Sequence, residues 1–315
     1  MTLTQLEYIL AVEATGSFSR AARRCHVTQP TLSMQISKLE RELGVTIFDR
    51  SRQPVTPTVI GAEALREAQA CLRSSRRLRE LIQERQNLIA GDLRLGVIPT
   101  IAGYLLPLVA QSFMERYPLV RLEVRELVTE DIVRRLKRDE LDAAVIVTPL
   151  QDAEIRERPL YWEEFTLYVS ADHPLARQKT VSPDALERGD MALLNEGHCM
   201  RNQMLRLCPD SDRHAESARL RFSGGSLDTL QRIVERGYGF TLLPELAIER
   251  LSDDERALVR KFRRPAPVRE VSLVSCRAVA RRALIAAFCD HILEHIPSRM
   301  KAPGRRSVIP WSDKS

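Results

Sequence analysis

The sequence contains no apolar run that approaches the ~18 residues needed to span a membrane. Its first ten residues, MTLTQLEYIL, place Glu7 inside the first apolar stretch and lack the basic start and apolar block of a signal peptide. Hydrophobic residues make up 44% of the 315 residues and charged residues 29%, which is typical of a soluble globular protein. We therefore expect a cytoplasmic protein with no membrane contact, and a secreted solute-binding protein is disfavoured.

The motifs of common enzymes and metal sites are also missing. The chain has no GxGxxG fingerprint, Walker loop, GxSxG elbow or HExxH helix. No two cysteines form a CxxC pair or lie at zinc-finger spacing. The sequence therefore predicts no metal site and no cofactor.

Six cysteines raise a separate question, because cytosolic thiols are normally kept reduced. They are Cys25, Cys71, Cys199, Cys208, Cys276 and Cys289. Cys71, Cys276 and Cys289 lie in apolar helix or strand patterns, where we expect buried and unreactive thiols. Cys25 lies between a helix and a turn and is also expected in a core. Cys199 and Cys208 both lie in the stretch HCMRNQMLRLC, which runs from His198 to Cys208. By itself this stretch leaves four alternatives open: a metal-binding site, a structural disulfide, two core cysteines or a reactive pair.

Positive charge is concentrated towards the two ends of the chain. The net charge is +6, and residues 297–315 carry five Lys or Arg against one Asp. Residues 1–90 carry 13 Lys or Arg against nine Asp or Glu, which leaves residues 91–296 with a net charge of −2. Any nucleic-acid contact is therefore expected at the ends, although excesses of this size also occur on ordinary surfaces.

Three helices are predicted near the N-terminus. Apolar residues recur at helical spacing over residues 3–14, and Gly16 ends that run. Ser17 is a suitable N-cap for a second helix that reaches Arg24. Thr28 can cap a third helix, TLSMQISKLERELG, which combines an apolar stripe with a polar face at its start.

A helix, a turn and a second helix with this polar face are typical of a helix-turn-helix, whose second helix fits the major groove of DNA. The following VTIFDRSRQPVTPT predicts a short hairpin, or wing, that lies on the phosphate backbone. Similar helix pairs also occur in other helical domains, so the residues alone leave the function of this pair open. The predicted contacts with double-stranded DNA are Thr28, Gln29, Pro30, Thr31, Ser33, Gln35, Lys38, Arg50 and Arg52.

The chain is expected to have four segments. Residues 1–58 form the winged helix-turn-helix, and residues 59–90 form one long helix whose apolar stripe pairs with a second copy, unless it is a solvated linker. Residues 91–296 alternate strand-like and helical patterns, which predicts an α/β effector domain with mainly parallel strands, as one domain or as two lobes with a cleft. Residues 297–315 are basic and proline-rich, and we expect disorder there.

The stretch LEYILAVEATGSFSRAARRCHVTQPTLSMQISKLERELGVTIFDR resembles the winged helix-turn-helix of LysR-type transcriptional regulators, with its core AAxxxxVTQPTLSxQIxxLE. The resemblance covers nearly the whole chain and implies a two-lobed effector domain like a type 2 periplasmic binding protein. Within the family, GHCMRNQMLRLC is similar to the corresponding stretch of the activators that sense hydrogen peroxide. The flanking GVIPTIAGYLLP and SLDTLQRIVERGYGFTLLPELA strengthen that similarity.

The resemblance implies roles for the cysteine stretch. Cys199 matches the peroxide-reacting cysteine, and Cys208 matches the cysteine that resolves the product. The positions that match the peroxide pocket are Thr100, Thr129, His198 and Arg201. Two departures bear on the rate of the switch: Asn202 replaces the usual Asp, and Gly224-Gly225 replaces bulkier residues.

Peroxide reacts with a thiolate, so Cys199 needs a pKa below the usual ~8.5. Arg201, His198 and the amides of a helix that begins here can stabilise the anion. The resulting sulfenic acid condenses with a second thiol. If residues 199–208 formed one helix, its ends would lie ~13.5 Å apart along the axis. A disulfide needs Cα atoms at roughly 4.4–6.8 Å, so closing the pair must rearrange the segment.

The resemblance therefore implies a DNA-binding transcriptional regulator that senses hydrogen peroxide through a reversible Cys199–Cys208 disulfide and controls oxidative-stress genes. We expect a homodimer or homotetramer; family analogy adds RNA polymerase and glutaredoxin, or a similar reductant, as partners. A sensor reacts once and then awaits reduction, so we expect no enzyme turnover. Two alternatives stay open: a LysR-type regulator of a small organic ligand with incidental cysteines, and a thiol peroxidase with a DNA-binding unit.

Overall fold

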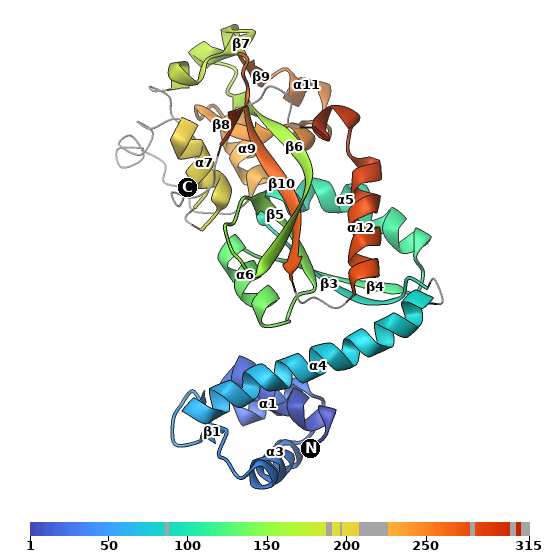
Figure 1. The fold of residues 1–315 in the computed structure, drawn as a ribbon. Coiled ribbons are helices and arrows are strands. Elements are labelled where there is room, and N and C mark those ends of the chain that lie inside the picture. Colours follow the sequence, from blue (N-terminus) through green and yellow to red (C-terminus); the bar gives the residue numbers. More distant parts are fainter. Residues whose placement is uncertain are drawn as a thin grey trace. The chain divides into compact units, whose positions relative to one another are not determined.

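The computed structural model describes residues 1–85, 88–186, 191–195, 197–207, 226–277, 281–302 and 307–309. The chain divides into two compact units, Met1–Leu88 and Ile89–Ser315. The first unit is built on helices around one core, and the second is built on a mixed sheet with two cores (Figure 1). Within the described ranges, no helix combines the length and the hydropathy that a membrane crossing requires.

The first unit confirms the predicted starts and ends of its helices. These are α1 (Leu3–Thr15), α2 (Phe18–Arg24) and α3 (Gln29–Leu43). The hydroxyls of Ser17 and Thr28 accept hydrogen bonds from backbone N–H groups in the first turns of α2 and α3. Gly16 and Gly44 end α1 and α3 with φ of 61° and 69°, a left-handed conformation that favours glycine. Of the predicted apolar stripe of α3, Leu32, Ile36 and Leu39 are fully buried in the core of this unit, whereas Leu43 at the end of the helix is exposed.

The wing also forms as predicted, as an antiparallel pair of β1 (Phe48–Asp49) and β2 (Thr56–Pro57). It leads into the long helix α4 (Val59–Arg85). Gly61 lies so close to the wing that a Cβ atom there would be 2.0 Å from the carbonyl oxygen of Ile47. The first turn of α4 can therefore pack on the wing only because residue 61 has no side chain.

The sheet of the second unit follows the path β4-β3-β5-β10-β6-β9-β7, with β11 on β10 and β8 on β6. Its strands are β3 (Gly91–Val97), β4 (Val120–Glu126), β5 (Ala143–Thr148), β6 (Ile155–Val169), β7 (Thr180–Val181), β8 (Phe240–Pro244), β9 (Val259–Phe262), β10 (Pro267–Cys276) and β11 (Ser307–Val308). The expectation of mainly parallel strands is wrong. β3 runs parallel to β4 and β5, but β10 runs antiparallel to both β5 and β6. The reason is that β10 returns alongside the long strand β6 and so enters the sheet against the direction of β5 (Figure 1).

Two hydrophobic cores define the two lobes of this unit. The helices are α5 (Pro99–Arg116), α6 (Thr129–Lys137), α7 (Cys199–Leu207), α9 (Leu227–Glu235), α10 (Glu245–Ile248), α11 (Asp253–Arg256) and α12 (Arg282–His295), with 3-10 turns η1 (Pro174–Arg177), η2 (Pro183–Leu186) and η3 (Ser298–Met300). Helix α7 contributes to both cores. Cys199 belongs to the first core, whereas Met200 and Met204 belong to the second. A change in α7 therefore acts on the packing of both lobes.

The expected disorder of residues 297–315 is wrong for the part of this segment that is described. Met300 is fully buried, and Ser307 and Val308 extend the sheet as β11 on β10. The carbonyl oxygen of Ile309 accepts a hydrogen bond of 2.8 Å from Gln203 Nε2 in α7. Apolar side chains dispersed within a basic, proline-rich stretch therefore add to the fold, which overall composition does not reveal.

Candidate functional site

The candidate site lies where three helices begin. Cys199 is the first residue of α7, Thr129 is the first residue of α6, and Thr100 is the second residue of α5. All three side chains are buried. Gly197, with φ of 87°, turns the chain into α7, and a Cβ there would lie 3.8 Å from Val128 Cγ1. The start of α7 therefore lies beside the start of α6.

Arg269 supplies the charge of the site, and the sequence analysis missed it. It lies on β10, is fully buried, and donates from Nη1 to Thr100 Oγ1 at 3.2 Å and from Nη2 to the Thr100 carbonyl at 2.9 Å. Its Nε donates to Glu163 Oε1 on β6 at 2.8 Å. The signal in the sequence was weak. Arg269 and Glu270 are the charged residues of a strand that is otherwise apolar or small, and buried charges need partners. Glu163, however, stands in a strand with several other charged residues.

Tyrosine hydroxyls complete this buried network. Arg269 Nη2 donates to Tyr104 Oη at 2.6 Å, and Tyr104 in turn donates to Glu163 Oε1 at 2.8 Å. The second carboxylate oxygen of Glu163 and the hydroxyl of Tyr161 have no hydrogen-bond partner among the described residues. The site is thus polar, enclosed and incompletely satisfied, although it is surrounded by a hydrophobic core.

The Cys199 thiol does not have the low pKa that the proposed chemistry was expected to need. Burial raises its pKa above the ordinary value. The Arg269 charge, the Thr129 hydroxyl and the backbone amides of Met200 and Cys199 act in the opposite direction but are outweighed. The resting cysteine is therefore a protonated thiol at neutral pH, in an environment that is already arranged to favour its anion.

The Thr129 hydroxyl is buried and has no hydrogen-bond partner of adequate geometry among the described residues. It nevertheless lies close enough to the Cys199 sulfur to favour the thiolate. A buried hydroxyl without a partner costs about 1–3 kcal/mol, so its presence here requires an explanation. A small polar molecule beside the sulfur would satisfy it.

His198 and Arg201 have local roles. His198 is mostly buried, and burial lowers its pKa below the usual value, so the imidazole is neutral at pH 7 and brings no positive charge to the thiol. Arg201 Nη1 donates to the Leu194 carbonyl at 3.1 Å, which ties α7 to the preceding segment. The cationic group that lowers the pKa of Cys199 is Arg269.

Cys208 and Gly224-Gly225 lie outside the described residues. The described part of the stretch is the helix α7, with Asn202 on its exposed side. From its first to its last residue, a helix of nine residues rises ~12 Å. Cys199 is therefore held at one end of α7, with the chain leading to Cys208 at the other end.

The other cysteines differ from the expectation in one case. Cys289 is fully buried, whereas Cys25 and Cys276 are half-buried. Cys71 is exposed, so the expectation of a core residue there is wrong for the single chain. The physical reason is helical spacing: Leu72 faces the core, and the preceding residue points ~100° away from it.

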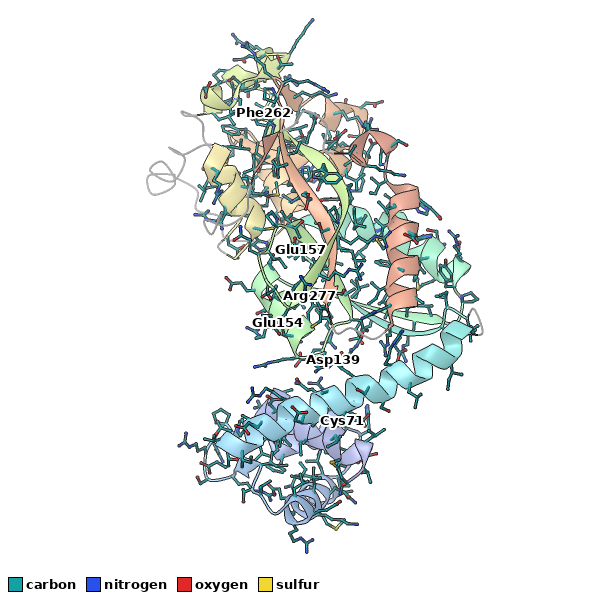
Figure 2. All side chains as sticks on the ribbon, in the orientation of Figure 1. Cys71, Asp139, Glu154, Glu157, Phe262 and Arg277 are labelled. Atoms are coloured by element: carbon teal, nitrogen blue, oxygen red, sulfur yellow. The ribbon has the colours of Figure 1, made fainter. Side chains whose placement is uncertain are left out.

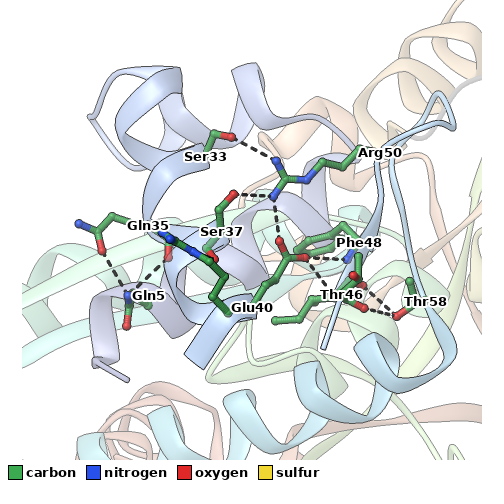
Figure 3. Close-up of polar contacts among 11 residues, drawn as sticks. Gln5, Ser33, Gln35, Ser37, Glu40, Thr46, Phe48, Arg50 and Thr58 are labelled. Carbon is green, nitrogen blue, oxygen red and sulfur yellow. Dashed lines mark hydrogen bonds and ion pairs between the residues drawn. The ribbon is translucent and has the colours of Figure 1, made fainter. Parts of the chain in front are cut away.

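The candidate DNA-contacting residues lie at the start of α3 and around the wing. Thr28, Gln29, Pro30, Thr31 and Lys38 are exposed, whereas Ser33 and Gln35 are half-buried. Gln35 Oε1 accepts a hydrogen bond of 3.2 Å from Gln5 Nε2 on α1 (Figure 3). Gln35 is thus oriented from behind by a buried side chain of another helix.

Arg50 is bound to α3 instead of projecting freely from the wing. Its Nη1 donates to Ser33 Oγ at 3.4 Å, and its Nη2 donates to Ser37 Oγ at 3.1 Å and to Glu40 Oε2 at 2.9 Å (Figure 3). The other oxygen of Glu40 accepts from the backbone N–H groups of Ile47 and Phe48 at 2.8 and 3.3 Å. Glu40, which the sequence analysis missed, therefore joins the wing to the helix.

Arg52 pairs with Asp49 at 3.1 Å, and its side chain is 71% exposed. It is the wing arginine that faces solvent, and a surface ion pair of this kind adds little stability. Arg52 can therefore exchange this partner for a phosphate at small cost.

The fold and these sites together define a class of protein. Residues 3–62 match the bacterial regulatory helix-turn-helix protein of the lysR family, and residues 86–297 match the LysR substrate binding domain. The chain belongs to the LysR family of DNA-binding transcription regulators, with a helix-turn-helix unit followed by a two-lobed α/β regulatory domain.

Individual relatives resemble this chain over nearly its full length. A hydrogen peroxide-inducible genes activator from Dickeya chrysanthemi is 33% identical over 314 residues, which are 98% of this chain and 100% of the relative. A full-length OxyR structure from Pseudomonas aeruginosa, with a cysteine-to-aspartate substitution, is 34% identical with a TM-score of 0.76 and covers 94% of this chain and 99% of its own. An H2O2-bound OxyR cysteine-to-serine mutant from Corynebacterium glutamicum is 28% identical with a TM-score of 0.60, over 93% and 92% of the two chains.

Proposed function

We propose that this chain is a transcription regulator that senses hydrogen peroxide through Cys199 and controls oxidative-stress genes by its contacts with double-stranded DNA. The observation that carries the proposal is the buried Cys199 thiol beside the unpartnered Thr129 hydroxyl, within the field of Arg269. The names of the relatives support the same function, because they include hydrogen peroxide-inducible activators.

The first step is the oxidation of Cys199. Its sulfur attacks one oxygen of peroxide, an S–O bond forms and the O–O bond breaks, and the thiol proton leaves with the second oxygen as water. The sulfur loses two electrons and becomes a sulfenic acid. The Thr129 hydroxyl holds the peroxide, and Arg269 stabilises negative charge on sulfur during the attack. Thr100, held by Arg269, forms the opposite side of the pocket.

The second step is the capture of the sulfenic acid by the Cys208 thiol. An S–S bond forms and a second water leaves. A disulfide needs Cα atoms within roughly 4.4–6.8 Å, whereas α7 separates its ends by ~12 Å. The helix must therefore unwind at least in part. Met200 and Met204 then lose their places in the core of the second lobe.

The segment α7 therefore has two states, a packed helix in the reduced protein and an unwound segment in the oxidised protein. Because α7 joins both cores, the oxidised regulatory domain packs differently and alters how copies associate in a homodimer or homotetramer. RNA polymerase and glutaredoxin, or a similar dithiol reductant, are the further partners of this cycle. His198 stays neutral and orients the entry to α7.

The test is a peroxide titration of the reduced full-length protein with disulfide mapping by mass spectrometry. One equivalent of peroxide is expected to produce a 199–208 link within minutes. Cys208→Ser should stop at a sulfenic acid that a trapping reagent detects, and Cys289→Ser is the matched control that should behave as wild type. If the wild-type protein forms no 199–208 link, the sensor proposal fails and a small organic ligand becomes the better hypothesis.

A second measurement separates a sensor from a thiol peroxidase. With excess dithiol reductant, a sensor should consume peroxide slowly, because reduction of its disulfide must first reverse the change in α7. Footprinting of reduced and oxidised protein on the same DNA should show a different length of protected sequence. Rapid multiple turnover with unchanged footprints would instead favour the peroxidase.

A further inference from the structure

A second pocket lies in the second unit, between α12 and one face of the β6–β10 pair, with a volume of about 210 Å³. Residues of the paired strands β6 and β10 line one side of this pocket. Ser275 lies opposite Arg156, and Leu273 lies opposite Arg158. Because side chains alternate along a strand, these four residues share one face of the sheet, and Arg277 follows on the same face. The sheet thus presents three arginines to one recess.

Helix α12 forms the opposite wall. The residues that line the pocket from this side are Arg282, Ile285, Ala286 and Cys289. Their spacing of three, four and seven residues puts them on one face of the helix. Ala286 and Cys289, with Ser275 across from them, are small side chains, and their size leaves the recess open. The pocket is therefore a consequence of both the sheet register and the helix pattern.

Four arginines line the pocket, and only one of them has an acidic partner among the described residues. Arg158 Nη2 pairs with Asp290 Oδ1 at 2.7 Å. Arg156, Arg277 and Arg282 have no ion pair in the described part of the chain.

The acidic side chains nearest to this end of β6 are already engaged. Figure 2 shows Glu154, Glu157 and Arg277 at the same end of the β6–β10 pair. Glu154 pairs with Lys137 at 2.9 Å, and Glu157 Oε1 accepts a hydrogen bond of 2.9 Å from the Leu150 N–H. Glu157 lines the neighbouring cavity together with Arg156 and Arg277, so its single carboxylate offsets only part of their charge. The remaining excess of positive charge is unfavourable unless an anion joins it.

We propose that this pocket binds the phosphate group of a small phosphorylated compound. Several guanidinium forks suit the oxygens of phosphate, and a multiply charged anion matches the excess of positive charge. The recess is smaller than the ~300–1,000 Å³ of pockets for drug-sized ligands, so it holds the anionic group alone. An adjoining cavity of about 720 Å³ shares Arg156 and Arg277 and accepts the rest of the compound.

The test uses pyrophosphate as the probe and isothermal titration calorimetry on the reduced full-length protein at constant ionic strength. We expect one site per chain, and the double variant Arg156→Gln/Arg277→Gln should bind at least tenfold more weakly. The double variant Arg121→Gln/Lys179→Gln, which removes two exposed cations that line neither cavity, is the matched control for the loss of two charges. Equal affinity in the wild type and the double variant would overturn the proposal.

Ala286→Leu provides a second, charge-neutral test, because it fills the recess and should also weaken binding at least tenfold. A random-sequence DNA duplex tests the other source of phosphate. If the double variant loses duplex affinity while pyrophosphate fails to bind the wild type, the arginines form a DNA-backbone contact and the proposal is wrong. Cys199→Ser should bind pyrophosphate as the wild type does, so this result is independent of the peroxide function.

Discussion

Arg269 and Glu163 form an ion pair of 2.8 Å in which both side chains are fully buried. A pair of this kind contributes little net stability, but the loss of one partner leaves an uncompensated buried charge that costs about 3–5 kcal/mol. Here the pair also bears on the Cys199 site, because Arg269 favours the Cys199 thiolate and Glu163 is the carboxylate that binds Arg269.

Glu163→Gln should speed the oxidation of Cys199. The substitution keeps an oxygen for Tyr104 and Arg269 but removes the negative charge, so the arginine acts more strongly on the sulfur. We expect a rate of peroxide oxidation at pH 7 that is roughly three- to tenfold higher, equivalent to at most about one pKa unit. Arg269→Gln should change the rate in the opposite direction. Glu164→Gln, which removes a carboxylate paired with Arg264 at 3.9 Å, is the control. Equal rates for the two opposing variants would contradict this account.

The rate of Cys199 oxidation should depend steeply on pH. Only the thiolate reacts, and the raised pKa keeps the thiol protonated. The rate should therefore rise about tenfold per pH unit from pH 7 and continue to rise beyond ~8.5, the pKa of an unperturbed thiol. The stability of the folded protein should change with pH in the opposite direction to the oxidation rate. Because the pKa of Cys199 is higher in the folded than in the unfolded state, its contribution to the free energy of unfolding is fully present below the unfolded-state pKa. This contribution is lost as the pH rises through the folded-state pKa. Stopped-flow kinetics across pH 6–10 would test this, and a plateau below pH 8 would rule it out.

Thr129→Val should stabilise the protein and impair the sensor. The variant removes a buried hydroxyl that has no hydrogen-bond partner of adequate geometry in the described part of the chain, so the free energy of unfolding should rise by about 1 kcal/mol. Oxidation should be at least tenfold slower, because the hydroxyl that favours the thiolate is gone. Thr148→Val is the matched control: its hydroxyl donates to Glu270 Oε1 at 2.6 Å, so this variant should lose stability without slowing oxidation. A destabilised Thr129→Val would show that the hydroxyl is satisfied in solution.

Gly61→Ala should disrupt the DNA-binding unit. The added methyl group would meet the Ile47 carbonyl, which is backbone and cannot move aside without shifting the wing. We expect a loss of about 1–3 kcal/mol in the unfolding free energy of this unit and weakened specific DNA binding. Ala62→Ser, at the exposed neighbouring position, should change stability by less than about 0.5 kcal/mol. Chemical denaturation monitored for each unit would measure both values.

Gln35→Ala should weaken specific DNA binding without changing the oxidation of Cys199. A side chain that contacts a base contributes about 1–3 kcal/mol to discrimination, so the ratio of specific to random-sequence affinity should fall accordingly. Lys38→Gln should instead weaken binding to all sequences and reduce the salt dependence. Fluorescence anisotropy with both duplexes at several salt concentrations distinguishes the two patterns. An unchanged specificity ratio for Gln35→Ala would show that Gln35 serves only to join α3 to α1 through its hydrogen bond with Gln5.

Local features of the fold were predictable because they depend on neighbouring residues. Ser17, Thr28 and the left-handed glycines mark helix ends through contacts within one turn, and the structure confirms them. The same holds for the wing and for the apolar stripe of α3 up to Leu39. The direction of β10 could not be predicted in this way, because a strand has the same alternation in a parallel and an antiparallel pair.

In the candidate site, too, some features depend on neighbouring residues and others on tertiary contacts. By itself, the sequence determined which thiols belong to one short stretch, and that a helix over this stretch keeps its ends too far apart for a disulfide. Only the tertiary structure decided which cation faces Cys199, since Arg269 and Glu163 are 106 residues apart and meet through the pairing of β10 with β6. It also decided the sign of the pKa shift. Desolvation depends on every group packed around the sulfur, and those groups come from helices and strands that are distant in the chain.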